Sequence, residues 1–510
     1  MAHSKERLTK AGDYNLETCE ILSYKIVGGP PGSQVPFRID IQNIIISIEL
    51  QQSIFNRTMV GKIQVYDTKD VRTVAPITGL EKLNLKFHTP GLSGICNVAN
   101  EGHPFHIYKI ESVAPDGVNG STYDIYFCSR EAYYNNMRKV SKAYTGPIEL
   151  GVEDIFKNTK YLNSRKSLYV EPTKRPTRMV LPNVRPFEAI DMLSRKAISG
   201  KYENAGYLFY ETKEGYHFRS IESLLAVAGT VVRPAKWFYN FGMKGVRDER
   251  TGSKQIVKDL HGVNSWNLTR PVDVLNNIDA GAYASKLIEH DMFNKLINET
   301  FYDYAKDFGN HFHTEHQGGY KSDKKLPLPQ AKFDTLYHPI SEEYDQKVMF
   351  KSSTSYVHDM TDPKTGDLTV IDSISDRYTT QKALSQRKLL ANGILELQAP
   401  GNSLLQAGDI ITFDMPLMES LGHNKKLKSN PFWAGRYLIY DMKHMISKTD
   451  DVYSVHIRAV KDTVAHPFMP EHNSWTHIAP TAKTYNLYEV DNELLGRMSP
   501  TRWDIEGTPF

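Results

Sequence analysis

The chain has 510 residues, and at roughly 100–200 residues per domain this length predicts three to four domains. The hydrophobic share of 40% is enough for several cores. Its 62 basic and 59 acidic residues leave a net charge of +3, so composition provides no bulk attraction to nucleic acid or to an anionic membrane. The three cysteines, Cys19, Cys96 and Cys128, are too few and too scattered for a disulfide framework or a zinc module.

No targeting or membrane segment is visible in the sequence. The first sixteen residues, MAHSKERLTKAGDYNL, lack the apolar stretch of a signal peptide, and nowhere do about 18 apolar residues follow one another. We therefore expect no membrane contact and folding in a reducing cytosol.

The N-terminal part of the chain predicts a small β-barrel. Residues 1–20 are polar and predict a flexible segment, whereas residues 21–130 are rich in strand patterns. Apolar residues alternate with polar ones over 37–48, and residues 105–128 predict a hairpin whose loop contains Asp116-Gly117 and Asn119-Gly120. Because a closed barrel leaves no exposed strand edges, we expect these short strands to close.

The middle of the chain predicts two mixed regions. In the first, 131–234, Pro186 suits the first position of a helix, and a hairpin turns at Lys213–Gly215. In the second, 235–375, Trp237 and Tyr239 alternate like a strand. Apolar residues over 287–308 predict an amphipathic helix, and 311–375 predict a polar loop insertion.

The last structured region, 376–462, predicts a second β-barrel. Residues 376–392 predict a helix that ends at Asn392-Gly393, and four strand patterns follow. The remaining residues, 463–510, predict an extended tail that cannot bury much against itself, so we expect another chain to be its partner. The predicted fold class is thus α+β and β-rich, with two small β-barrels flanking mixed α/β domains.

Several of these stretches resemble one protein family. The segment MVGKIQVYDTKDVRTVAPITGLEKLNLKF, with Tyr66-Asp67 followed by Ile77, Gly79, Glu81, Leu83, Leu85 and Phe87, is similar to the first barrel of the central baseplate hub protein of contractile-tailed phages. RPFEAIDMLSRKA with YLFYETKEGYHFRSI is similar to the middle domain of that family, and ANGILELQAPGNSLLQAGDIITFDMP with YLIYDMKHMIS to its second barrel.

The resemblance implies a trimer whose two barrels per chain form a pseudo-six-fold ring. It implies a structural virion protein of the tail baseplate, assembled in the host cytoplasm, that joins the hexameric tail tube to the trimeric central spike. The implied partners are the spike, a tail tube or tube-initiator protein and the surrounding wedge proteins, with the tape-measure protein or DNA passing through the lumen. The polar 311–375 insertion and the long tail depart from the family pattern.

Two alternatives remain open at this level. The same architecture occurs in the spike or hub subunit of bacterial contractile injection systems, where a β-helical needle follows in the same chain. The second alternative is a virion-associated metal-dependent hydrolase. Its candidate metal ligands are His311, His313, Glu315 and His316, because residues two apart on a strand point the same way.

The sequence otherwise favours a protein that is not an enzyme and has no cofactor. It contains no Gly-x-Ser-x-Gly, Walker, Rossmann or His-Glu-x-x-His pattern, so we identify no catalytic or cofactor-binding residue. Residues 138–185 hold eleven Lys and Arg against four Asp and Glu. This segment predicts either a solvated face paired with acidic neighbours or a basic lining of a channel.

Overall fold

The computed structural model describes most of the chain up to Val464. The described residues are 8–27, 35–74, 77–91, 102–116, 120–174, 176–202, 204–227, 231–241, 256, 259–270, 273–291, 295–314, 326–327, 346–353, 358–361, 368–371, 375–390, 393–415, 430 and 433–464. Several features named in the sequence analysis lie outside these ranges. They are Cys96, Glu315, His316, Asn392 at the predicted end of a helix, and the predicted tail beyond Val464.

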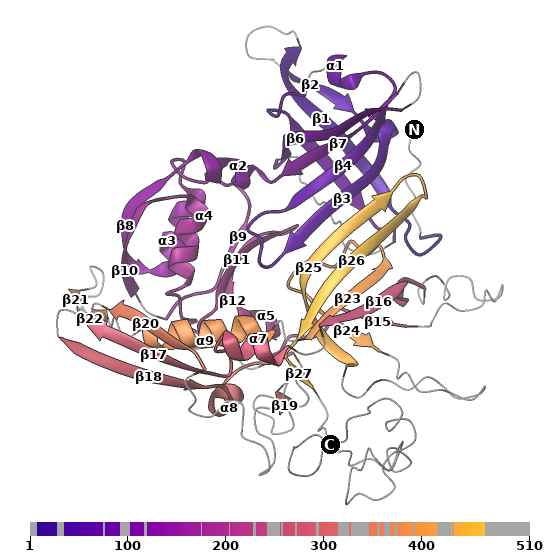
Figure 1. The fold of residues 1–510 in the computed structure, drawn as a ribbon. Helices are drawn as coiled ribbons and strands as arrows, with labels where there is room; N and C mark the ends of the chain where they lie inside the picture. Colours follow the sequence, from indigo (N-terminus) through magenta and orange to yellow (C-terminus); the bar gives the residue numbers. More distant parts are fainter. Residues whose placement is uncertain are drawn as a thin grey trace, which may run out of the picture. The chain divides into compact units, whose positions relative to one another are not determined.

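A single 13-stranded sheet joins the two strand-rich ends of the sequence (Figure 1). Its main path runs β16-β23-β26-β25-β3-β4-β7-β6-β5-β1-β2, and β24 pairs with β25 and with β15 beside that path. The N-terminal strands are β1 (Asn15–Val27), β2 (Val35–Asp40), β3 (Ile45–Ser53), β4 (Val60–Asp67), β5 (Lys82–His88), β6 (Phe105–Pro115) and β7 (Ser121–Cys128). The others are β15 (Trp237–Asn240), β16 (Ser265–Arg270), β23 (Gly393–Pro400), β24 (Ile410–Asp414), β25 (Gly435–Ser447) and β26 (Val452–Lys461).

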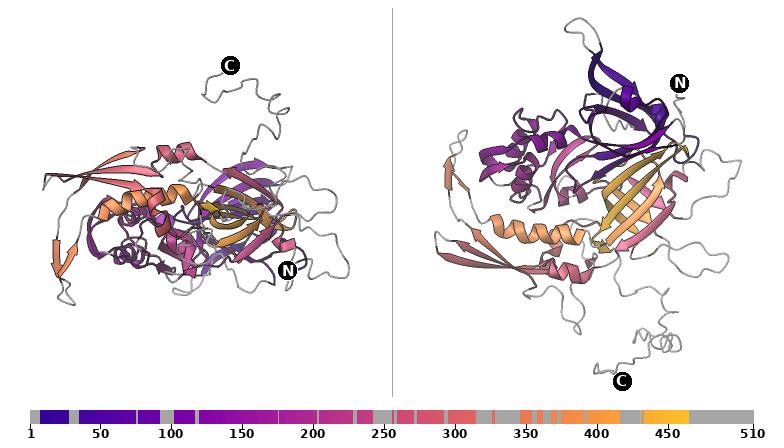
Figure 2. Two further views of the ribbon diagram at one scale, coloured as in Figure 1. Left: turned by 90° about the horizontal axis from the view of Figure 1, so that it is seen from below. Right: turned by 45° about the horizontal axis from the view of Figure 1, so that its top comes forward.

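The two halves of the sheet meet at one antiparallel pair, β3 with β25. The register runs from Ser47 opposite Ser447 to Ser53 opposite Asp441. Each of these strands is also the first strand of a hairpin, β3–β4 and β25–β26, so the junction is flanked by a hairpin on either side (Figure 2). The ladder therefore continues from one predicted barrel directly into the other.

The predicted β-rich α+β class is confirmed, but strand pairing among the described residues does not close either half into a barrel. In the C-terminal half the two end strands are β15 and β16, and among the described residues an isolated bridge pairs Asn240, at the end of β15, with Gly262, which precedes β16. Alternation along a strand determines which side chains face inward, and these do share one apolar core in both halves. It does not determine which strand lies next to a given edge.

The N-terminal segment is shorter than predicted. Strand β1 begins at Asn15 rather than at Ile21, and it pairs with both β2 and β5. Ahead of it, the carboxylate of the buried Asp13 accepts hydrogen bonds from the backbone N–H groups of Thr9 and Lys10. A carboxylate that binds backbone donors in this way can order a polar segment that has no apolar pattern.

The middle region forms a compact α/β block around its own core, as the helix and hairpin patterns predicted. Pro186 is the first residue of α4 (Pro186–Ser194), and β11 (Tyr207–Thr212) pairs with β12 (Gly215–Ser220) across the expected turn. The other elements are α2 (Arg130–Met137), β8 (Val140–Pro147), α3 (Ile148–Lys157), β9 (Leu168–Val170), β10 (Pro176–Val184) and α5 (Ile221–Leu225). Apolar residues of α3, α4, β11 and β12 form the core between them.

The amphipathic helix predicted over 287–308 is wrong. Residues Ala284–Asp291 and Leu296–Asp303 are strands β17 and β18 of an antiparallel hairpin, and β20 (Val348–Ser353) adds to it in parallel. Burial alternates along β17, where Ser285, Leu287 and Glu289 are buried. The apolar spacing fitted both periods, and β-branched residues in a short apolar run favour the strand.

Helix α9 (Ser375–Leu390) covers one face of the β17–β18–β20 sheet (Figure 1). Gln381 donates hydrogen bonds to the carbonyl oxygens of Ser285 and Thr300, and Ser385 donates to that of Ala282. The predicted helix over 376–392 is thus present and is fixed to the hairpin by polar contacts.

The remaining elements are short. They are η1 (Gln42–Ile44), α1 (Val71–Val74), β13 (Ala226–Val227), β14 (Val231–Val232), α7 (Val274–Asp279), α8 (Tyr304–Asp307), η2 (Phe308–Asn310), β19 (Leu326–Pro327), β21 (His358–Thr361), β22 (Leu368–Ile371) and β27 (Thr463–Val464). None of the helices in the described ranges combines the length and apolar character needed to cross a bilayer.

Candidate functional site: an arginine-lined pocket

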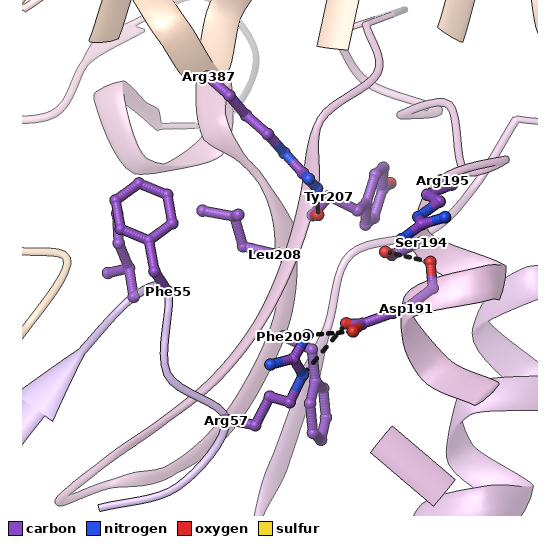
Figure 3. A pocket seen from close by; sticks show the side chains of 10 residues that line it. Phe55, Arg57, Asp191, Ser194, Arg195, Tyr207, Leu208, Phe209 and Arg387 are labelled. Atoms are coloured by element: carbon purple, nitrogen blue, oxygen red, sulfur yellow. Dashed lines mark hydrogen bonds and ion pairs between the residues drawn. The ribbon is translucent and has the colours of Figure 1, made fainter. Parts of the chain in front are cut away.

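A pocket of about 140 Å³ lies where four separate segments meet (Figure 3). The segment after β3 contributes Ile54, Phe55 and Arg57, and the end of α4 contributes Asp191, Ser194 and Arg195. Strand β11 contributes Tyr207, Leu208 and Phe209, and α9 contributes Arg387. Three guanidinium groups from three different elements thus approach one small space.

Local structure fixes the acidic residue of this pocket. Helix α4 begins with Pro186, and the Glu188 carboxylate accepts a hydrogen bond from the Arg185 backbone N–H, which stabilises the helix start. At the other end of the helix, the Ser194 hydroxyl donates to the Asp191 carbonyl oxygen at 2.9 Å. Asp191 is therefore held on a well-defined helical turn facing the β3–β4 connection.

Only one of the three arginines has a carboxylate partner in the pocket. Both Arg57 Nε, at 3.4 Å, and an Arg57 terminal nitrogen bind the Asp191 carboxylate (Figure 3). Arg387 donates to the Tyr207 carbonyl oxygen at 2.9 Å. The Arg195 side chain has no hydrogen-bond or ion-pair partner within the described ranges. The pocket therefore carries two more positive than negative charges.

The electrostatics reflect this surplus. The Arg387 residue is exposed, and its guanidinium group is partly desolvated by the surrounding protein atoms. This burial lowers the pKa of Arg387, and the positive charges of Arg195 and Arg57 lower it further against the opposing effect of Asp191. An anion in the pocket would relieve the repulsion among the three groups.

Two of the four candidate metal ligands, His311 and His313, lie within the part of the chain that the structure describes. His311 and His313 are both buried. His311 Nδ1 lies 2.7 Å from Glu222 Oε1 and its Nε2 lies 2.8 Å from Asp307 Oδ2. His313 Nδ1 lies 2.7 Å from Asp462 Oδ2, and its Nε2 lies 2.9 Å from the Phe308 carbonyl oxygen. All four ring nitrogens therefore already have hydrogen-bond partners.

The charges around His311 identify it as the cation of a buried ion cluster. Although burial opposes the charged imidazole, hydrogen bonds to Asp307 and Glu222 raise the pKa of His311 to about 9. In return, hydrogen bonding to His311 holds the pKa of Asp307 well below its usual range against the effect of burial. Within the described ranges, no group of three or more His, Cys, Asp or Glu residues could hold a metal ion.

The basic segment 138–185 is partly neutralised by its neighbours. Lys142 pairs with Asp154 at 2.9 Å, and Lys157 pairs with Glu153 one helical turn away. Lys166 is enclosed between the carboxylates of Glu131 and Glu211. Although burial opposes its charge, the attraction of Glu211 and Glu131 raises the pKa of Lys166. Of these three lysines, Lys166 is paired with acidic neighbours outside the segment, as one of the two interpretations expects, whereas Lys142 and Lys157 are paired with acidic residues of the segment itself.

Sequence reasoning did not find the arginine pocket. The numbering puts 134 positions between Arg57 and Asp191, and 196 positions between Asp191 and Arg387. No sequence motif links the three residues. The only local signal is the pairing of an exposed aromatic residue with an arginine at Phe55 and Arg57.

Comparison with solved structures identifies similar chains with low sequence identity. A tail protein from Neisseria meningitidis is 8% identical, with a TM-score of 0.46, and the match covers 88% of this chain and 97% of that one. A tail protein of the prophage MuSo2 from Shewanella oneidensis is 9% identical, with a TM-score of 0.44 and coverages of 87% and 98%. An E. coli component of the type VI secretion system is 12% identical, with a TM-score of 0.33 and coverages of 84% and 76%.

No family model and no curated protein matches the sequence. The solved structures to which the chain is similar thus include two proteins described as tail proteins and a component of the type VI secretion system.

Proposed function

We propose that this protein is a structural component of a phage tail, the trimeric central hub of the baseplate that adapts the hexameric tail tube to the trimeric spike. One observation carries the proposal. Two strand-rich halves of one chain, each with a hairpin at the junction, are joined edge to edge through β3 and β25. Three chains with two such halves each supply six sheet units around an axis, and a closed ring needs rotational symmetry of this kind.

An exposed sheet face supports the presence of a second copy. On the side of β17, β18 and β20 opposite to α9, four apolar side chains are between 50% and 70% exposed: Ile297, Phe301, Val348 and Phe350. The ion pair of Lys286 with Glu299 lies on the same face, so the surface is mixed. Exposed apolar side chains grouped in this way commonly mark a protein interface. In a trimer it would be covered by the neighbouring chain.

We also propose that the protein is not an enzyme. The sequence contains no catalytic motif, and the two candidate histidines that the structure describes, His311 and His313, already contact carboxylates and a carbonyl oxygen. The proposed location is the tail baseplate of a virion assembled in the host cytoplasm. The proposed partners are the spike, the tube or its initiator, the wedge proteins, and the tape-measure protein or DNA in the lumen.

The test is the mass of the purified chain, measured by native mass spectrometry and sedimentation, together with low-resolution images. We expect three times the mass of the 510-residue chain and particles with six similar features at one end and three at the other. A chain that remains monomeric at micromolar concentration, both alone and when mixed with its spike and tube partners, would contradict the proposal.

A further inference from the structure

We propose that the pocket formed by Arg57, Arg195 and Arg387 binds a carboxylate side chain from an acidic segment of another protein. The inference goes beyond the proposed function, because the pocket lies within a single chain and its occupation does not require a trimer. It concerns the chemistry of a partner that no motif in the sequence indicates.

The charge of the pocket selects an anion. Asp191 neutralises Arg57, with which it forms a two-pronged ion pair, whereas Arg195 and Arg387 have no carboxylate partner within the described ranges. Arginine is suited to this task because its planar group presents several N–H donors to a carboxylate or phosphate at once. The surplus of two positive charges is thus matched by one or two acidic groups from outside.

The size of the pocket limits what can enter. A volume of about 140 Å³ is close to that of an apolar cavity of about 150 Å³ that holds one benzene molecule. One side chain of the size of glutamate or of an aromatic residue can be accommodated. A folded domain or a nucleic-acid duplex cannot enter, and only a projecting group can.

The walls favour a protein over a nucleic acid. Besides the arginines, the pocket is lined by Ile54, Leu208 and Phe209, and by Phe55, which is 42% exposed. Aromatic residues and arginines beside one another are the composition of energetic hot spots in protein interfaces. The methylene groups of a glutamate, or an apolar residue next to it in a peptide, would contact these walls, while its carboxylate meets the guanidinium groups.

The experiment titrates the full chain with the peptide acetyl-GGEFEGG-amide and measures affinity by isothermal calorimetry and NMR line broadening. The neutral analogue acetyl-GGQFQGG-amide tests the need for a carboxylate. Phenyl phosphate and a single-stranded DNA dodecamer test the alternative anions. The variant Arg195→Gln with Arg387→Gln removes the two guanidinium groups that have no carboxylate partner within the described ranges, and Arg195→Lys with Arg387→Lys retains the charge but not the planar fork.

The matched control is Arg165→Gln, an exposed arginine of the middle block that does not line the pocket. We expect the acidic peptide to bind, and the neutral peptide and the double Gln variant to lose about tenfold or more in affinity, with Arg165→Gln unchanged. If the double Lys variant melts at the same temperature as the parent and keeps part of the affinity for the acidic peptide, this result would support the role of charge.

Three results would overturn the inference. They are equal binding of the acidic and neutral peptides, binding of phenyl phosphate and DNA in preference to the peptide, and no measurable peptide binding by the folded chain. Because the trimer is measured separately by mass, loss of peptide binding with an intact trimer refutes the pocket assignment alone.

Discussion

His311 shows how a single buried residue can make the stability of this protein depend on pH. Its imidazole faces Glu222 on α5 and Asp307 on α8, and Lys382 on α9 lies 3.2 Å from Asp307. The neighbouring amides of Asn204 and Gln386 also lie within 3 Å of its Nδ1. Four parts of the fold therefore meet at one charged ring.

We predict that His311→Gln removes a stabilisation that depends on pH. Because the pKa of His311 is raised to about 9 in the folded chain from 6.5, its contribution is fully present below about pH 6.5 and is lost as the pH rises through about 9. At pH 6 it should be on the order of 3 kcal/mol. Denaturant unfolding at pH 6, 7.5 and 9.5 measures it, with His290→Gln as the control. A difference between parent and variant that does not change with pH would contradict the role of the imidazolium.

Gly61 illustrates a close approach that only glycine allows. It lies opposite Phe127 of β7, and an added Cβ would overlap the Phe127 ring and lie 2.6 Å from the Glu49 carbonyl oxygen. We predict that Gly61→Ala lowers the free energy of unfolding by about 2 kcal/mol, because backbone must shift to make room. Gly102→Ala, where no atom lies within 4 Å of the added carbon, should be nearly neutral. Equal melting temperatures for the two variants would count against this packing.

Among the strands, the β3–β25 pair connects the two halves of the main sheet. The fold contains one apolar core that includes residues of both halves, so the pair is an interior contact and not an exposed edge. Its hydrogen bonds are therefore expected to be required for the cooperative unfolding of the whole sheet.

We predict that Glu49→Pro destabilises this junction by about 3 kcal/mol or more. Proline cannot donate to the ladder, and Glu49 lies in the interior of β3, between Met445 of β25 and Lys62 of β4. Glu49→Gln is the matched control, because it keeps the backbone N–H and loses only the ion pair with Lys443. Thermal unfolding followed by circular dichroism compares the two. If the proline variant melts at the same temperature as the glutamine variant, the β3–β25 pair does not contribute the expected stability.

For the assembled protein, the exposed face of β17, β18 and β20 offers a direct test of the proposed trimer. We predict that Ile297→Glu combined with Phe350→Glu lowers the measured mass from trimer to monomer, because like charges would be buried against the neighbouring chain. Both side chains are at least 65% exposed in the single chain, so its melting should change little. Val180→Glu, equally exposed on β10, is the control. A trimer that persists in the double variant would place the interface elsewhere.

Much of the local structure was predictable from the sequence, since it depends on neighbours along the chain. The start of α4 at Pro186, the turn between β11 and β12 and the long hairpins of both ends follow from capping, turn chemistry and alternation. The strands at 284–303 were mistaken for a helix because a short apolar run satisfies both periods, and only pairing with β20 and cover by α9 decide between them.

Patterns along the chain were sufficient to predict the strands of the main sheet and the side chains that face its core, because both properties repeat with a period of two; they were not sufficient for β17 and β18. The tertiary structure alone decided that β3 joins β25, that His311 is enclosed by carboxylates, and that Arg57, Arg195 and Arg387 share a pocket. The physical reason is that hydrogen bonds across a sheet and electrostatic contacts act over a few ångströms in space, between residues that can be hundreds of positions apart in the chain.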